Sequence, residues 1–162
     1  MSQENVNLAV PYGKKVLYID KIVSPHYLKL DQPIGQTDPL HCTALGKALL
    51  SGMTESEFTE FCQSTELKQY TKRTITNRDA LWKVLVKTRK RGYATDLGEL
   101  REGIHCIGSP IHDSANKVIA AISISAPAIR LTKERMKKLE APLVEVAREI
   151  SRKMALPSFE AK

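Results

Sequence analysis

The sequence predicts an α+β domain in which helices pack on a largely antiparallel sheet. Apolar runs that pair as hairpins occur near both ends of the chain, and helical periodicity fills the regions between and after them. Strands joined by short turns pair antiparallel, which argues against a doubly wound parallel sheet. With 162 residues, 42% hydrophobic and 27% charged, the chain has the size and composition of one globular domain.

The N-terminal third predicts a hairpin. Residues 6–10 alternate between apolar and polar, residues 12–15 contain a glycine and form the turn, and residues 16–23 read as the returning strand. Residues 28–30 are expected to form a further short strand, which ends before Pro33.

Four helices are predicted where apolar residues recur at helical spacing between capping and stop residues. They cover about 43–51, 55–63, from a cap at Thr76 or Asn77 to Arg91, and from Thr132 to about Met154. Pro142 is expected to kink the last helix or to mark its real start.

A second hairpin carries the candidate site. Residues 104–111 and 118–126 read as strands around a turn at 113–117. Because side chains alternate between the faces of a strand, Ser123 and Ser125 share one face, and its apolar neighbours point the other way.

Three further groups are expected to meet these serines. Cys106 lies on the facing strand, and Asp96 precedes a loop that contains two glycines and could fold over the same face. Apolar walls would come from Leu45, Ile104 and Ala121. Few polar groups within apolar walls are typical of a small-molecule pocket, so the pattern favours ligand binding.

The stretch from Leu40 to Leu50 is predicted to contribute a helix start to this pocket. Thr43 can cap the helix, and Ala44 and Gly46 leave its first turn without bulky side chains. The backbone N–H groups at such a start are expected to contact a small anion.

Catalysis and metal binding are weaker alternatives from the same residues. Cys106 with His105 or His41 could form a nucleophile and base, but adjacent residues on a strand face opposite sides, which prevents a Cys106–His105 dyad. Cys106, His112 and Asp96 could hold a metal ion. We expect neither an enzyme nor a bound cofactor, and leave the metal open.

The net charge of +7 is concentrated in one stretch. Nine Lys and Arg residues lie between Lys68 and Arg91, opposed by Asp79. This pattern could contact nucleic acid, but helical spacing favours a solvated helix face. The three cysteines lack metal-knuckle spacing, and residues 1–20 do not read as a signal peptide, which together indicate a cytoplasmic protein without a membrane segment.

The ordered set of motifs resembles the effector-binding domain of the IclR family of bacterial transcription regulators. The resemblance runs from about residue 4 to 154, over the segments 7–10, 16–22, 40–47, 74–76, 89–94, 96–106, 110–113, 120–125 and 147–151. It implies a GAF-like fold over residues 1–155, followed by a flexible tail at 156–162, and a homodimer or homotetramer that binds a small organic acid or sugar acid.

The resemblance also implies roles for single residues. It places Ala44, Leu45 and Gly46 at the ligand-contacting helix start. It makes Asp96, Cys106, Ser123 and Ser125 polar pocket residues, and Ile104 a pocket wall. None of these is Lys or Arg. The family reads DNA through a winged helix-turn-helix that precedes this domain, and we expect that module to lie outside this sequence, so that DNA contact occurs only through it.

Overall fold

The structure is a computed structural model that describes residues 2–155. Six strands form one antiparallel sheet in the order β3-β2-β1-β6-β5-β4. The strands are β1 (Asn5–Tyr12), β2 (Lys15–Ile22), β3 (Thr37–Pro39), β4 (Ala94–Leu97), β5 (Ile104–His112) and β6 (Val118–Pro127). The predicted α+β class and antiparallel sheet are confirmed.

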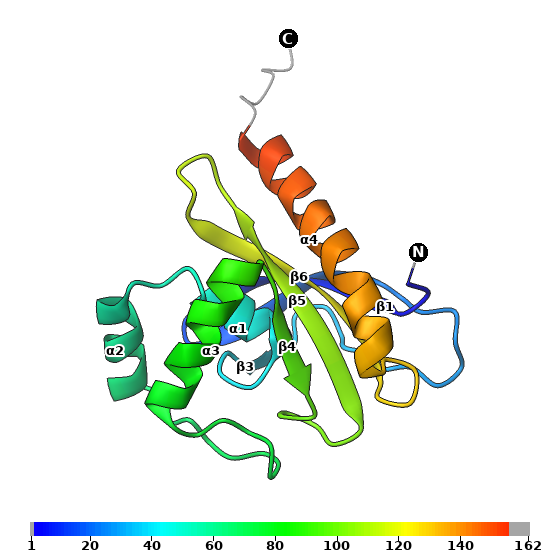
Figure 1. The fold of residues 1–162 in the computed structure, drawn as a ribbon, viewed down its shortest axis with the longest axis horizontal. Helices are drawn as coiled ribbons and strands as arrows, with labels where there is room; N and C mark the ends of the chain where they lie inside the picture. Colours follow the sequence, from blue (N-terminus) through cyan, green and yellow to red (C-terminus); the bar gives the residue numbers. More distant parts are fainter. Residues whose placement is uncertain (1, 156–162) are drawn as a thin grey trace.

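Four helices cover this sheet. They are α1 (Ala44–Leu50), α2 (Glu55–Gln63), α3 (Arg78–Arg91) and α4 (Lys133–Ala155). In Figure 1, α1, α2 and α3 gather on one side and α4 crosses the other. Thr43 caps α1, a capping box of Thr54 and Glu57 starts α2, and left-handed Gly92 ends α3, as the sequence predicted.

Both faces of the sheet are packed. The larger core joins Leu45, Leu81 and Leu85 of the helices to the side of the sheet that carries Ala9 and Ala121. A smaller core joins α4 to the opposite side, through Ile107, Ile124 and Leu143 among others. The face of β6 that carries Ser123 and Ser125 therefore lies beneath α1, and the opposite face of β6 lies beneath α4.

One sequence expectation for a single element was wrong, and two strands were not foreseen. Residues 28–30 form no strand. The backbone carbonyls of Leu28 and Leu30 accept hydrogen bonds from the side chains of Arg130 and Asn5 and not from a neighbouring strand. Two short strands, β3 and β4, were missed because three or four residues give too little alternation to detect. Pro142 does not start the last helix, which runs through it from Lys133. The tail predicted at 156–162 lies outside the described residues.

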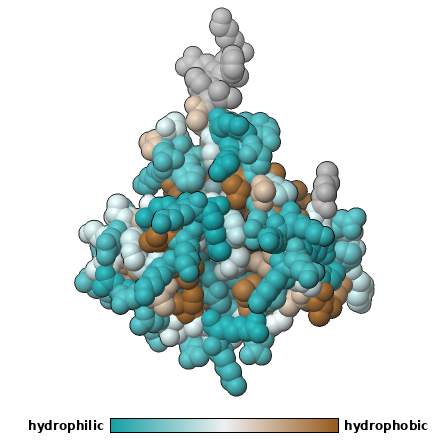
Figure 2. Space-filling model, in the orientation of Figure 1, coloured by the Kyte–Doolittle hydropathy of each residue, from teal (hydrophilic) through white to brown (hydrophobic). Residues whose placement is uncertain are grey.

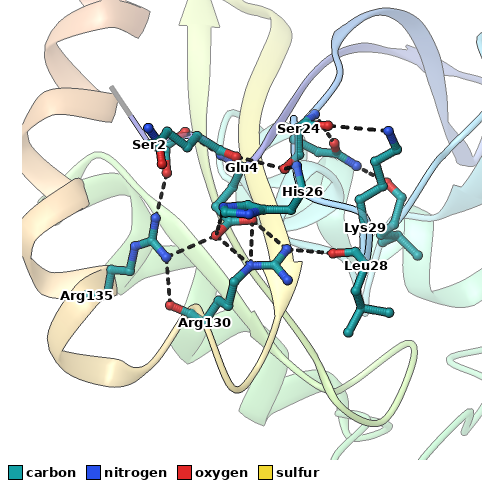
Figure 3. A network of polar contacts seen from close by, with 11 residues as sticks. Ser2, Glu4, Ser24, His26, Leu28, Lys29, Arg130 and Arg135 are labelled. Atoms are coloured by element: carbon teal, nitrogen blue, oxygen red, sulfur yellow. Dashed lines mark hydrogen bonds and ion pairs between the residues drawn. The ribbon is translucent and has the colours of Figure 1, made fainter.

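The N-terminal residues are tied to the start of α4 by a polar network, which Figure 3 shows. The buried Glu4 carboxylate accepts hydrogen bonds from Arg130 and Arg135, and His26 lies 4.0 Å from it. Arg135 also donates to the backbone carbonyl of Ser2, at 2.6 Å. The point where β1 begins is therefore fixed to both α4 and the segment that follows β2.

The nine Lys and Arg residues between Lys68 and Arg91 are all exposed, and some of them also make local contacts. Arg89 donates to the backbone carbonyls of Ser51 and Met53, and Arg91 stacks over the ring of Tyr93. Lys83 and Lys87 are exposed, and Figure 2 shows a largely hydrophilic surface on this side of the molecule. No helix within residues 2–155 is long and apolar enough to cross a membrane.

Candidate functional site

Four strands contribute one polar side chain each to a row across the sheet. Asp96 of β4 pairs in register with Cys106 of β5, Cys106 pairs with Ser125 of β6, and Ser125 pairs with Asn5 of β1. Directly opposite residues in a sheet share a face, so the four side chains lie side by side. The expected meeting of Asp96, Cys106 and Ser125 is therefore present.

The neighbouring row brings α1 down onto the sheet. It runs from Gly108 through Ser123 to Asn7. Because Gly108 has no side chain, the first residue of α1 approaches so closely that a Cβ on Gly108 would lie 2.9 Å from the Ala44 carbonyl. This approach puts Ala44 and Leu45 over the serine row.

The two rows and α1 enclose a small cavity of about 20 Å³. Seven of the eight predicted site residues line it: Ala44, Leu45, Asp96, Ile104, Cys106, Ser123 and Ser125. Gly46 lies outside the lining. Its amide donates to Thr43 Oγ1 at 2.9 Å, and a Cβ there would lie 2.2 Å from the Leu40 carbonyl oxygen, so this glycine serves helix packing.

One polar atom that lines the cavity, Ser123 Oγ, is buried and has no hydrogen-bond partner within the described part of the chain. Asn7 Oδ1, on the strand paired with Ser123, is also buried without a partner but does not line the cavity. The Asn7 amide donates to Ser125 Oγ at 3.3 Å, so its carbonyl oxygen is the unused end. Buried polar atoms are rarely left without a partner, and such atoms at a cavity indicate a place where a ligand can bond.

The Asp96 carboxyl has a raised pKa. Burial raises its pKa to about 6, although the backbone amide of Glu99 donates to Asp96 Oδ1 at 2.6 Å and Lys47 lies near. Lys47 is itself buried in an ion pair with Glu99, directly behind the pocket. Near neutral pH, Asp96 can therefore exchange a proton in response to a charged ligand.

The Cys106 thiol is not activated. Burial and the nearby Asp96 carboxyl raise its pKa, which keeps it protonated. His105 Nδ1 bonds the Leu131 carbonyl on the other side of the sheet, and His41 Nε2 bonds the Lys68 carbonyl. Both ring contacts are to backbone, so neither histidine is placed as the base of a cysteine dyad.

The proposed metal set is not assembled. Cys106 lies beside Asp96, but His112 stands at the far end of β5, where its amide donates to Ser151 Oγ on α4. Across residues 2–155, no three His, Cys, Asp or Glu side chains come close enough together to hold a metal ion.

Sequence reasoning missed one side of the pocket. Tyr18, Gln32, Asp38 and Arg101 also line it, with Leu30, Thr43 and Leu100. The Tyr18 hydroxyl donates to Asp38 Oδ2 at 3.0 Å, and Gln32 Nε2 donates to the same oxygen at 2.8 Å. Alternation along β2 could have indicated a buried Tyr18, whereas Gln32 and Arg101 lie on irregular segments that give no such signal.

Arg101 adds a positive charge that the matched residues lack. None of the residues matched to the family is Lys or Arg, but the Arg101 side chain is also part of the lining. Its NH1 group donates to Gln32 Oε1 at 3.3 Å, and its NH2 group lies 3.9 Å from Asp38 Oδ1.

Comparison with known proteins identifies the family of this chain. Residues 1–152 match the family model described as "Bacterial transcriptional regulator IclR C-terminal". The chain belongs to the IclR family of bacterial transcriptional regulators. It corresponds to the C-terminal, effector-binding domain of these proteins, which confirms the resemblance drawn from the motifs.

Relatives in the IclR family are similar over nearly the whole chain. The HTH-type transcriptional regulator KdgR of Escherichia coli is 38% identical over 98% of this chain and 60% of its own length. The HTH-type transcriptional repressor AllR of Escherichia coli is 35% identical over 96% of this chain and 58% of its own. The chain thus spans about 60% of the curated relatives it matches, and these relatives are transcriptional regulators.

Solved IclR structures share the same architecture. The C-terminal domain of E. coli KdgR has a TM-score of 0.84 at 37% identity and covers 95% of this chain and 89% of its own. Thermotoga maritima IclR has a TM-score of 0.90 at 38% identity and covers 96% of this chain and 63% of its own.

Proposed function

We propose that this domain senses a small hydroxy acid, keto-acid hydrate or sugar acid, which binds in the pocket between α1 and the β4–β6 strands. The observation that carries the proposal is the unused hydrogen-bonding capacity of Ser123 Oγ, buried at the cavity beside Ser125. Apolar walls of Leu45 and Ile104 flank these hydroxyls. An apolar pocket with a few directed polar groups suits a compact polar metabolite.

The roles of the polar residues follow from their chemistry. Ser123 and Ser125 can each donate to a ligand oxygen and accept from a ligand hydroxyl. An ionised Asp96 repels a carboxylate, so Asp96 is assigned to a ligand hydroxyl, from which it accepts. This assignment favours hydroxylated acids over plain dicarboxylates.

We further propose that the ligand tunes the oligomer and DNA binding of a longer regulator that acts in the cytoplasm. The relatives are named as HTH-type regulators, and this chain spans about 60% of them. A ligand shifts such a protein only if it binds one quaternary state, homodimer or homotetramer, more tightly than another.

A thermal-shift screen of hydroxy acids, keto acids and sugar acids tests the site, with neutral polyols of the same length as controls. An acid that stabilises the domain should lose this effect in the Ser125→Ala, Asp96→Asn double variant. Ser109→Ala is the matched control, because Ser109 is a buried serine of β5 that donates to the Gly92 carbonyl, away from the pocket. Undiminished stabilisation of the double variant would contradict the proposed site.

A further inference from the structure

The cavity as it stands is narrow. Its volume of about 20 Å³ leaves little free space around a bound molecule. We therefore expect the segments that cover the pocket to adjust when a ligand of the proposed class enters.

Two segments cover the pocket, and they differ in one backbone contact. In the loop 98–103, side chains bond the backbone, where Thr71 Oγ1 donates to the Gly98 carbonyl at 2.7 Å and Thr74 Oγ1 donates to the Glu99 carbonyl at 2.6 Å. At its other end, the Ala128 amide donates to the Gly103 carbonyl at 2.7 Å.

The second segment, residues 23–32, is held by side chains. We call it the strap. Among the described residues, it makes no backbone–backbone hydrogen bond to the rest of the domain. Asn5 bonds the backbone of Ser24 and Leu30, and Arg130 donates to the Leu28 carbonyl at 2.8 Å, as part of the network in Figure 3.

The inner end of the strap reaches the pocket through Gln32. Its amide group donates to Asp38, and its carbonyl oxygen accepts from Arg101 NH1 at 3.3 Å. Asp38 Oδ1 lies at a looser 3.9 Å from Arg101 NH2, and Asp38 Oδ2 accepts from the Tyr18 hydroxyl and from Gln32. The guanidinium has five donors in a fork that matches a carboxylate, so a single long bond to a neutral amide leaves it available.

We propose that Arg101 selects anionic ligands for this pocket, and that Gln32 holds its guanidinium until an anion displaces the Gln32 side-chain carbonyl. This displacement loosens the inner end of the strap, which Lys21 still holds at the Gln32 backbone carbonyl, at 3.1 Å. Arg101 is the only Lys or Arg in the pocket lining that the structure describes. Asp38 and Asp96 oppose it, so the selectivity depends on this one cation. The inference rests on the proposed function, because it concerns the ligand of the same pocket.

Cys106 allows a test without any effector. Methanethiosulfonates form a mixed disulfide with a cysteine and release methanesulfinate, and they are available with an anionic sulfonatoethyl or a cationic trimethylammonioethyl group. In the Cys62→Ser chain, mass spectrometry follows Cys106 in the pocket and Cys42, which is buried and reports global unfolding. At Cys106, the rate with the anionic reagent is divided by the rate with the cationic reagent. Both rates are lowered equally by the low reactivity of the thiol, so their ratio does not depend on it.

We expect Arg101→Gln to lower the anion-to-cation rate ratio by roughly fivefold, since one charge at about 4 Å is worth about 1 kcal/mol even in water. Lys72→Gln, which removes an exposed charge outside the pocket, is the control. Gln32→Ala should accelerate both reagents and keep the ratio. An unchanged ratio in Arg101→Gln, an equal fall in Lys72→Gln, or no acceleration in Gln32→Ala would overturn the proposal.

Hydrogen exchange of the unaltered chain gives a second test, which does not depend on whether any variant folds. Backbone amides of 26–31 should exchange faster than those of 99–102. The reverse order would show that the loop moves and not the strap. Neither measurement uses an effector. If the modification of Cys106 depends on reagent charge as expected but no acid binds in the thermal-shift screen, that result would count against the proposed function and not against the role of Arg101.

Discussion

Ala44 at the start of α1 rests on the bare backbone of Gly108, so closely that a Cβ there would lie 2.9 Å from the Ala44 carbonyl. This contact sets the height of α1 above the serine row. It is a contact between two backbones, and neither can move aside as a flexible side chain would.

Gly108→Ala should therefore lift α1 and destabilise the domain by about 1–3 kcal/mol, the usual cost of inserting a methylene into a packed region. Urea unfolding measures this change. Gly13→Ala is the control, because Gly13 has open space around it and its φ of +56° adds backbone strain alone. A Gly108→Ala cost no larger than that of Gly13→Ala would contradict the close approach.

Lys47→Met should destabilise the domain by about 3–5 kcal/mol, because it leaves the Glu99 carboxylate buried without its partner. The Lys47→Met, Glu99→Gln double variant should recover a large part of this loss, since no unpaired charge remains. Chemical unfolding of the double variant and of the Lys47→Met and Glu99→Gln single variants checks the expectation. A loss of stability in the double variant equal to the sum of the two single losses would mean that the pair is not coupled.

Asp96→Asn should change how stability depends on pH. Burial raises the Asp96 pKa from 3.8 to about 6 in the folded state, so protonation stabilises the fold fully below pH 3.8 and this contribution is lost as pH rises to 6. The variant should therefore gain about 2–3 kcal/mol relative to the parent between pH 4 and pH 7. Unfolding at these two pH values tests it, and parallel profiles would rule out the raised pKa.

Glu4→Gln should weaken the anchoring of β1 and make stability less sensitive to acid. Burial alone would raise the Glu4 pKa, but the hydrogen bond and charge of Arg130, with the charge of Arg135, lower it overall. A lowered pKa stabilises the fold above the unfolded value and loses this contribution as pH falls. The parent should therefore lose more stability than Glu4→Gln on acidification below pH 4.5. Equal losses in both proteins would contradict this role.

The sequence was sufficient for the parts of the pocket that regular strands build. The turn at 113–117 sets the pairing of β5 with β6, and alternation then fixes that Cys106 and Ser125 share a face. Asp96 was placed correctly although β4 itself was not recognised. Its position opposite Cys106 follows from the antiparallel pairing of β4 with β5.

The opposite wall of the pocket could not be predicted in the same way. Gln32 and Arg101 sit on segments without periodicity, and their positions depend on tertiary contacts with Asp38 and with each other. Gly46 was misplaced for a related reason. Small residues at a helix start allow either an anion or another backbone segment to approach. Only the position of the Leu40 backbone against Gly46 shows that the second explanation holds here.

The strap carries most of its side chains on the surface. Between Pro25 and Asp31 they are mostly exposed, and Tyr27 is fully so, which means that substitutions there cost the folded core little. Under the proposed role of the strap, changes confined to this short segment would alter access to the pocket while the sheet and its helices stay the same.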